Sequence, residues 1–283
     1  TRINCPGGLQ FGAHYFRCWK KGGHGPVTLH EALVQSCDTF FYQVAQRIGI
    51  DTIAEYARKF GLGAPTGIDL EHEKGGTIPD SAWKRRRFKQ PWYGGETLSA
   101  SIGQGYVTAT PLQMANAIAM LATAKRYRPH FVLQVETPEG EVVQRDTPQQ
   151  MAELNVRPTT LKQVRDALRD VVNTDRGTGK KARLHGVEVA GKTGTSQVVK
   201  LGKERLKPDK IPWQHRDHAW FVAFAPVDAP EIAVAAIVEH ADGGGGAVAA
   251  PLVGEVLTKY FELKRQREQR NYAQNRSTAD STF

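Results

Sequence analysis

A short run of residues late in the chain combines a cation, two hydroxyl groups and two glycines. Gly191-Lys192-Thr193-Gly194-Thr195 lies between two β-branched runs, Val187–Ala190 and Gln197–Val199, which is typical of an extended strand. Glycine in a strand usually marks the close approach of another backbone or a ligand. We therefore expect an accessible strand edge whose lysine, glycine N–H and threonines bind a carboxylate-bearing, peptide-like ligand that adds as a further strand. An ordinary glycine-bent strand with a solvated lysine is the alternative.

All three cysteines of the chain lie in its first 37 residues, close to a histidine. Cys5, Cys18, His24 and Cys37 follow the spacing C-x12-C-x5-H-x12-C, and three cysteines with one histidine are a common ligand set for an enclosed structural zinc ion. We expect these four side chains to bind Zn²⁺, with His14 as a lower-ranked ligand. A disulfide with one spare thiol or three free buried thiols are the alternatives.

Composition limits the class of protein. The chain has 283 residues, an apolar share of 40% and a formal net charge of +9, which fit one large domain with appendages. No apolar run approaches 18 residues and no secretory signal opens the chain, so we predict no membrane-spanning helix. The cations gather at residues 84–89, 200–210 and 264–276 without a nucleic-acid-binding motif. We expect a solvated basic surface that faces an anionic membrane or polymer, and no nucleic-acid partner.

The order of elements predicts an α+β fold. Helices precede a C-terminal cluster of three strands, and a last helix packs back, which indicates an antiparallel sheet flanked by helices. We expect a Cys/His loop region at 1–26, a main domain at 27–263 and a disordered polar tail at 264–283. Periodicity and caps predict helices at 29–34, 39–48, 51–60, 112–124, 160–172 and 247–263, a hairpin at 128–144, strands at 187–199, 219–225 and 232–238, and loops at 64–97 and 200–217.

Two motifs carry a family resemblance. Ser36-Cys37-Asp38 followed by Lys192-Thr193-Gly194 is similar to the S-x-N (here S-x-D) and K-T-G signatures of penicillin-binding proteins and serine β-lactamases. The chain resembles the transpeptidase domain of class B penicillin-binding proteins over roughly residues 15–263, and most of all the elongation-type penicillin-binding protein 2 of Gram-negative bacteria. The further stretches that carry this resemblance are Thr66–Leu70, Lys89–Tyr93, Gly103–Pro111 and Ala219–Pro226.

The resemblance implies an activity and a role for each motif residue. It implies a D,D-transpeptidase that cross-links peptidoglycan stem peptides through an acyl-enzyme and is a target of β-lactams. Ser36 would relay protons, Asp38 would orient the donor peptide and neighbouring lysines, and Lys192 would support the electrostatics of acylation. Thr193 and Thr195, on either side of Gly194, would bind the terminal carboxylate of the substrate, and the Thr195 N–H would form half of an oxyanion hole. A helix N-cap is a further role open to Ser36.

The resemblance also implies surroundings for the parent protein. Elongation-type relatives are similar at the cysteine–histidine positions, where a metal site is known. The expected ligands are stem peptides and β-lactams, and the expected partners are the glycosyltransferase and scaffold proteins of the elongation machinery. The expected location is the periplasm, with the parent protein held in the inner membrane by an N-terminal helix outside this chain.

The family's S-x-x-K signature is not found where the family places it. The nucleophilic serine should precede S-x-D and lie one helical turn before a lysine that activates it. The single match, Ser81-Ala-Trp-Lys84, follows S-x-D in a Pro/Gly-rich stretch and runs into Arg85–Arg87, so we expect it on a solvated surface. We expect an N-terminally truncated chain whose acyl serine lies upstream of Thr1 and which is inactive alone. The alternatives are a β-lactamase or D,D-carboxypeptidase-like hydrolase, and a non-catalytic penicillin-recognising sensor.

Overall fold

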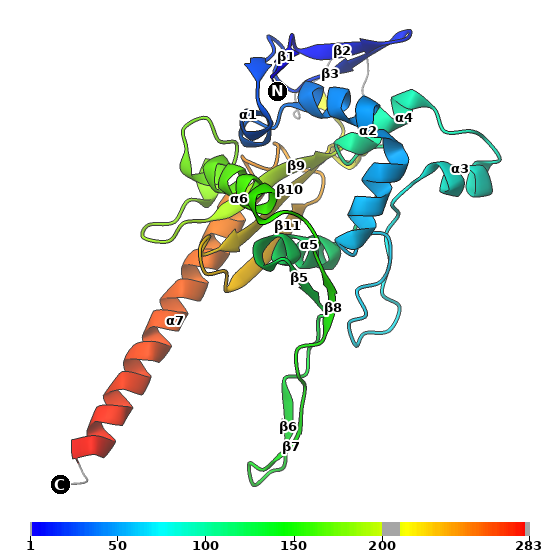
Figure 1. Cartoon of the computed structure of the whole chain (residues 1–283). Helices are drawn as coiled ribbons and strands as arrows, with labels where there is room; N and C mark the ends of the chain where they lie inside the picture. Colours follow the sequence, from blue (N-terminus) through cyan, green and yellow to red (C-terminus); the bar gives the residue numbers. More distant parts are fainter. Residues whose placement is uncertain (1, 200–209, 281–283) are drawn as a thin grey trace.

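The centre of the molecule is a three-stranded antiparallel sheet in the order β11-β10-β9 (Figure 1). The computed structural model describes residues 2–199 and 210–280, which leaves most of the predicted basic loop at 200–217 outside the described residues. The strands are β9 (Ala190–Ser196), β10 (His218–Ala225) and β11 (Ile232–Val238). The predicted cluster of three C-terminal strands is confirmed.

Helices cover the sheet because β10 is apolar on both of its faces. Phe221 and Ala223 share a core with Val253 of α7 (Ala249–Asp280). Their neighbours on the opposite face, Val222 and Phe224, pack with Ile118 of α5 (Pro111–Thr123). α6 (Pro158–Asn173) lies along β9. The predicted α+β arrangement, an antiparallel sheet flanked by helices, is confirmed.

A sharp junction separates the first two helices. α1 (Leu29–Val34) begins with the predicted capping box, in which Thr28 and Glu31 each bind the other's backbone N–H. α2 (Asp38–Lys59) starts four residues after α1 ends, so the predicted restart at Ser36-Cys37-Asp38 is confirmed. Gly49, with φ at 77°, kinks α2 between the two helices expected from the sequence. The junction matters because it carries the S-x-D motif.

Residues 3–27 contain four short strands, whereas the sequence predicted an irregular loop at 1–26. β1 (Ile3–Cys5) pairs with β4 (Gly25–Val27), and β2 (Gly8–Phe11) pairs with β3 (His14–Arg17). Strands of three or four residues bounded by glycines carry too little alternation to be recognised. These four strands, which we call the N-terminal module, pack on the start of α2 through Ile3, Cys5, Cys18, Val27, Ala32, Cys37 and Phe40.

The segment at 64–97 contains two helices where loops were expected. Asp80 caps α3 (Ser81–Phe88) by accepting a hydrogen bond from the Trp83 N–H at 2.6 Å. Glu96 holds the start of α4 (Gly94–Ser101) by accepting from the Tyr93 N–H at 2.9 Å. Prolines and glycines lie close to the ends of these short helices. Such residues are typical of loops, so a prediction that relied on periodicity missed both helices.

The polar tail, expected to be disordered, continues α7 as far as Asp280. Its Glu, Lys, Arg and Gln residues are strong helix formers. Side chains one turn apart also interact, as Lys264 does with Glu268 at 3.8 Å. Because the packed first half of α7 supplies the helix nucleus, the polar half needs only propagation.

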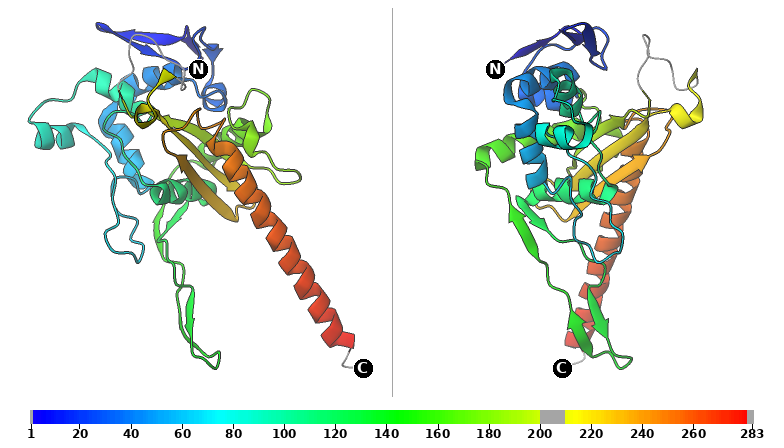
Figure 2. Two further views of the ribbon diagram at one scale, coloured as in Figure 1. Left: turned by 180° about the vertical axis from the view of Figure 1, so that it is seen from behind. Right: turned by 90° about the vertical axis from the view of Figure 1, so that its right-hand side faces the viewer.

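A long arm projects from the same end of the molecule as α7, opposite the N-terminal module (Figure 2). The predicted hairpin is confirmed as β6 (Gln134–Glu136) paired with β7 (Val142–Arg145). At its base β5 (Lys125–Tyr127) pairs with β8 (Gln150–Glu153). Two 3-10 turns, Lys180–Ala182 and Trp213–His215, complete the described elements.

Candidate active site

A cleft of about 1380 Å³ runs between β9 and the start of α2. It brings together both sequence motifs, since Ser36 and Asp38 line one wall and Lys192, Thr193 and Thr195 line the other. The N-terminal module closes one end with Trp19 and other residues. Residues 156 positions apart in the chain therefore face a single cavity.

The contact that joins the two motifs is a hydrogen bond from the Lys192 ammonium to the Ser36 hydroxyl. The Nζ–Oγ distance is 2.8 Å. Ser36 lies between α1 and α2 with φ at 54°, in the left-handed region that non-glycine residues rarely adopt. The N-cap of α2 is Cys37, so the alternative of an N-cap role for Ser36 is wrong. The strained junction instead directs the Ser36 hydroxyl toward Lys192.

Two partly buried charges set the electrostatics of the cleft. Burial lowers the pKa of the Lys192 ammonium to about 8, although the negative charge of Asp38 opposes this shift. Burial raises the pKa of the Asp38 carboxyl to about 7, and the nearby Cys18 sulfur adds to the rise. The Asp38 carboxylate accepts a hydrogen bond from the Trp19 backbone N–H at 2.9 Å. A lysine with a pKa near neutrality can exchange protons with a neighbouring hydroxyl group.

The backbone of β9 is shaped by glycines. A Cβ added at Gly191 would lie 2.7 Å from the Phe221 ring and 2.8 Å from the Val222 carbonyl oxygen, so only glycine allows β9 and β10 to approach there. A Cβ at Gly245 would lie 2.6 Å from the Gly194 carbonyl oxygen. The Gly243–Gly246 segment, predicted as a flexible break, therefore lies against the K-T-G strand.

The outer edge of β9 presents the expected hydroxyl groups. The Thr193 hydroxyl shares a hydrogen bond with the Thr178 hydroxyl at 2.9 Å. The Lys192 ammonium also donates to the Thr193 carbonyl oxygen at 3.1 Å. Lys192, Thr193 and Thr195 thus form a polar edge beside Ser36, which has the chemistry to hold a carboxylate next to a proton relay.

Gln104 is a site residue that sequence reasoning missed. Its side-chain N–H₂ donates to the Thr195 carbonyl oxygen at 2.5 Å, and its carbonyl oxygen accepts from the Gln197 backbone N–H at 3.1 Å. The amide therefore binds β9 as a neighbouring strand would, beside the position where a ligand would add. The only signal for this role was its place between Gly103 and Gly105, which is a weak pattern alone.

The cysteine–histidine cluster borders the cleft at the S-x-D junction, because Cys18 and His24 are among the residues that line the cleft. The ligand atoms of Cys5, Cys18, His24 and Cys37 all lie within 4.8 Å of one another. The three cysteines are buried and carry free thiols. His24 Nδ1 lies 3.5 Å from the Cys5 sulfur and 3.5 Å from the Cys18 sulfur. His14 is exposed on β3 and lies outside the cluster.

The cluster favours thiolate formation at one cysteine. A hydrogen bond from the Cys37 thiol lowers the pKa of the Cys18 thiol well below its usual range, and the same interaction raises the pKa of Cys37. Because Cys37 directly precedes Asp38, the cluster and the cleft share one stretch of backbone. The four residues that the sequence predicted as metal ligands lie close together in the structure.

Comparisons with known proteins agree with this geometry. The family described as the penicillin-binding protein transpeptidase domain matches residues 1–258. The chain belongs to this family. The resemblance stated from the motifs is thereby confirmed, together with the penicillin-binding protein transpeptidase-like α+β fold.

Curated relatives are identical to the chain at about two fifths of the aligned positions. It is 41% identical over 254 residues to the peptidoglycan D,D-transpeptidase MrdA of Haemophilus influenzae, which covers 88% of the chain and 38% of the relative. It is 38% identical over 244 residues to MrdA of Escherichia coli K12, which covers 86% of the chain and 38% of the relative. The chain thus spans well under half the length of these curated relatives.

Solved structures are similar over nearly the whole chain. The penicillin-binding protein PBP2 of Helicobacter pylori, solved in complex with MreC, has a TM-score of 0.79 at 33% identity and covers 93% of this chain and 45% of its own. PBP2 of Pseudomonas aeruginosa, solved with WCK 5153, has a TM-score of 0.77 at 37% identity and covers 92% of this chain and 55% of its own.

The S-x-x-K match at Ser81 has a structural role in this penicillin-binding domain. The Ser81 hydroxyl and N–H both bind the Asp51 carboxylate at 2.9 Å. Lys84 forms an ion pair with Glu96 of α4. The lysine is only 1% exposed, so the expectation that it lies on a solvated surface is wrong. Neither residue lines the cleft, as expected for a match without a catalytic role.

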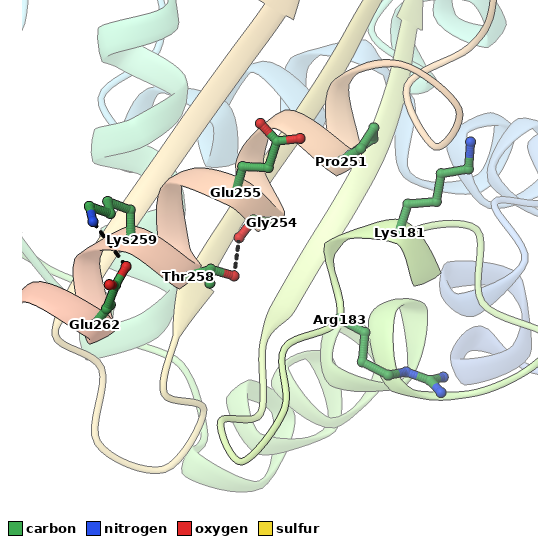
Figure 3. A pocket seen from close by; sticks show the side chains of 8 residues that line it. All are labelled: Lys181, Arg183, Pro251, Gly254, Glu255, Thr258, Lys259 and Glu262. Carbon is green, nitrogen blue, oxygen red and sulfur yellow. Dashed lines mark hydrogen bonds and ion pairs between the residues drawn. The ribbon is translucent and has the colours of Figure 1, made fainter. Parts of the chain in front are cut away.

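A second groove of about 430 Å³ lies between α7 and the Lys180–Ala182 turn (Figure 3). Lys259 pairs with Glu262 at 3.0 Å on its wall, and the Thr258 hydroxyl donates to the Gly254 carbonyl oxygen at 2.7 Å. Lys181 and Arg183 on the other wall donate to backbone carbonyl oxygens, and none of the predicted site residues lies in this groove. The cleft at β9 therefore remains the candidate active site.

Proposed function

We propose that this domain is the transpeptidase domain of a peptidoglycan D,D-transpeptidase that acts in cell elongation. The observation that carries the proposal is the 2.8 Å contact between Lys192 and Ser36 above the polar edge of β9. The MrdA relatives are named peptidoglycan D,D-transpeptidases, and the domain retains their family's S-x-D and K-T-G motifs. A stem peptide ending in D-Ala-D-Ala is the proposed donor, and β-lactams would mimic it.

In this proposal the donor peptide lies along β9 as an added strand. Thr193 and Thr195 hold its terminal carboxylate, while the Thr195 N–H stabilises the oxyanion that forms when a serine attacks the penultimate carbonyl carbon. The bond to the terminal D-Ala breaks, and Ser36 passes a proton to the leaving amine with Lys192 as its neighbour. An amine from a second stem peptide then attacks the ester, takes the acyl group and releases the serine.

The nucleophilic serine is proposed to lie in a part of the parent protein outside the printed sequence. The two residues of the single S-x-x-K match bind partners outside the cleft, since Ser81 binds Asp51 and Lys84 pairs with Glu96. Ser36 follows the S-x-D pattern and its partner lysine comes from β9. We therefore assign Ser36 to proton relay, with acylation left to another serine.

Penicillin labelling followed by intact mass measurement tests this assignment. Residues 1–283 alone should gain no covalent adduct, whereas a longer chain that includes an upstream S-x-x-K segment should gain one penicilloyl group. In the longer chain, Lys192→Met should slow labelling at least about a hundredfold, because it removes the charge beside the relay. An adduct on residues 1–283, or none on the longer chain, would contradict the proposal.

A hydrolase of the same fold is the second candidate. A β-lactamase would need a general base, such as a glutamate, that directs water onto the acyl-enzyme, and no such glutamate can be placed from this sequence. Penicillin labelling separates the two candidate activities. A hydrolase hydrolyses the penicilloyl ester and releases the product, whereas a transpeptidase keeps the penicilloyl group covalently bound. A non-catalytic penicillin-recognising sensor would retain the label yet fail to cross-link stem peptides.

We also propose that Cys5, Cys18, His24 and Cys37 hold a structural zinc ion. Zinc–sulfur and zinc–nitrogen bonds near 2.3 and 2.0 Å put tetrahedral nitrogen and sulfur ligands about 3.5 Å apart. The two nitrogen–sulfur distances at His24 are both 3.5 Å. Buried free thiols and an imidazole fit zinc in charge and softness. The ion would cross-link the N-terminal module to the start of α2 and take no part in the chemical steps.

Native mass measurement tests the zinc proposal directly. One zinc ion per chain, lost on acidification, is expected. A mass two hydrogens below that of the reduced chain would instead indicate a disulfide and contradict it. The His24→Ala variant should lose the ion, whereas His14→Ala, which changes an exposed histidine outside the cluster, should retain it.

The location and partners of the parent protein follow from the same proposal. Its substrate lies outside the cytoplasm, so we propose a periplasmic domain whose parent is held in the inner membrane by an N-terminal helix. Among the described residues, no helix has the length and apolar character needed to cross a membrane. Solved relatives include a complex with MreC and a peptidoglycan synthase complex of polymerisation and crosslinking. By analogy we propose a scaffold protein and a glycosyltransferase as partners.

A further inference from the structure

A projecting part of the molecule combines exposed aromatic rings with cations that form no ion pair with any residue that the structure describes. We call residues 80–106, which hold α3 and α4, the α3–α4 lobe. Its α4 part lies against α2, and its α3 part projects to the side of the molecule (Figures 1 and 2). Its exposed aromatic residues are Phe88, Tyr93 and Tyr106, at 42%, 54% and 37% exposure.

These rings are held in place by packing. Trp83 contacts Phe88 and Tyr106 at centroid distances of 5.6 and 5.2 Å, and Phe88 and Tyr106 lie 5.4 Å apart. The three rings come from α3 and from the loop after α4, so they pin the lobe into one shape. Rings that are both rigid and exposed lose little entropy when they bind a ligand.

The buried ammonium group of Lys84 lies against Tyr93, the most exposed of these three aromatic residues. The Lys84 ammonium lies 4.3 Å from the centroid of the Tyr93 ring and pairs with Glu96 beneath it. One face of the Tyr93 ring therefore covers the ammonium, while more than half of the side chain remains open to solvent. The lobe therefore presents a fixed aromatic surface, and the inner face of its Tyr93 ring already lies against the Lys84 ammonium.

Exposed cations come from the same helix, α3, and from its C-cap. Arg85, Arg87 and Lys89 are exposed, and none of them forms an ion pair with a residue that the structure describes. Exposed arginines without internal partners are available for carboxylate groups of a ligand. Charge and aromatic character together fit a polymer that has both flat apolar sugar faces and carboxylates.

The lobe is continuous with the candidate active site. Ser101, Ile102 and Gln104 line the cleft, and Gln104 binds the K-T-G strand. Tyr106 lies two residues further on, in the aromatic cluster. A polymer attached to a peptide in the cleft would therefore have the lobe within reach.

We infer that the α3–α4 lobe binds the glycan strands of peptidoglycan, with its aromatic rings against the sugars and its cations against stem-peptide carboxylates. This inference rests on the proposed function, because the cleft occupant is what brings the strand to the lobe. It adds a second contact surface that holds the polymer while the cleft holds one peptide. A tethered polymer raises the effective concentration of stem peptides at the cleft.

Co-sedimentation with purified, protein-free peptidoglycan sacculi tests the inference. Arg85→Gln with Arg87→Gln should lower binding about tenfold at low salt, through the loss of two carboxylate contacts. Arg265→Gln with Arg267→Gln, which removes the same charge from exposed positions of α7, should bind as the unchanged chain does. Tyr93→Leu should weaken binding about fivefold by removing the aromatic face, whereas Tyr272→Leu, which changes an exposed ring on α7, should not.

Three results would overturn the inference. They are no sedimentation of the unchanged chain with sacculi, equal losses in the α3 and α7 variants, and vesicles of phosphatidylglycerol and phosphatidylcholine that bind as tightly with the same dependence on Arg85 and Arg87. Circular dichroism of each variant confirms that it is folded.

Penicillin labelling of the longer chain separates this inference from the proposed function. The Arg85→Gln, Arg87→Gln variant should label at the unchanged rate, because neither arginine lines the cleft. A longer chain that binds sacculi through the lobe but never labels would refute the enzymatic proposal and leave the lobe inference standing.

Discussion

Lys192 is the residue on which the electrostatics of the cleft depend, and its state depends on Asp38. Burial lowers the pKa of Lys192 to about 8, and Asp38 supplies a negative charge that supports its ammonium form. Replacing Asp38 by Asn removes that negative charge, so the Lys192 pKa should fall below its value in the unchanged domain. NMR titration of side-chain-labelled lysines measures this directly, with exposed Lys162 as an internal reference. A Lys192 midpoint that stays constant or rises would contradict the assignment.

Gln104 supports β9 with two hydrogen bonds that a smaller side chain cannot make. Gln104→Ala should therefore lower the free energy of unfolding by about 1–2 kcal/mol. It should also slow penicillin labelling of the longer chain about tenfold, because the edge that positions the ligand becomes less ordered. Gln266→Ala, on the exposed half of α7, serves as the control in urea titration and labelling. Unchanged labelling by Gln104→Ala would limit the residue to a structural role.

At the scale of elements, the ion pair of Lys84 with Glu96 fastens α3 to α4. Lys84 is buried, so Lys84→Met leaves the Glu96 carboxylate partly buried without its cation. We expect a loss of about 2–4 kcal/mol in the free energy of unfolding, measured by urea titration. Lys162→Met, which breaks the exposed Lys162–Asp166 pair, should cost less than about 0.5 kcal/mol. Similar losses for both variants would show that the buried pair contributes no more than a surface pair.

Elements with a strong local signal could be predicted, and those fixed by distant contacts could not. The apolar runs of β10 and β11 and the capped helices α1 and α5 are visible in the sequence because burial and capping act over a few residues. β1 to β4 are too short for such a pattern. The polar half of α7 has the composition of a disordered tail and is helical because a packed helix precedes it.

The candidate site also has some features that could be predicted from the sequence and others that could not. The types and spacing of Ser36, Asp38 and Lys192 pointed to one site, because short motifs place particular chemistry on particular elements. The left-handed backbone of Ser36 and the two bonds from Gln104 to β9 depend on how α2, β9 and the loop after α4 pack. A single sequence holds no record of that packing.

At the scale of the whole molecule, the N-terminal module and the cleft are connected through one stretch of backbone. Cys37 belongs to the cysteine–histidine cluster, and the next residue, Asp38, lines the cleft. A second link runs from the module to the cleft through the Trp19 N–H, which donates to the Asp38 carboxylate. The small core of the module contains three cysteines, so its attachment depends heavily on the proposed zinc ion.

Zinc removal should therefore loosen the module while the sheet stays folded. With zinc at about one hundred times its dissociation constant, the ion stabilises the bound form by about 3 kcal/mol. Chelation, or His24→Ala, should remove that contribution from residues 3–27 and the start of α2. Hydrogen exchange resolved by peptide is the measurement, and β9 to β11 should keep their protection, because their core is formed by α5, α6 and α7. His14→Ala should match the unchanged chain. Loss of protection across the sheet at the same zinc concentration would mean that the domain unfolds as one unit, and no change anywhere would mean that the cluster holds no structural metal.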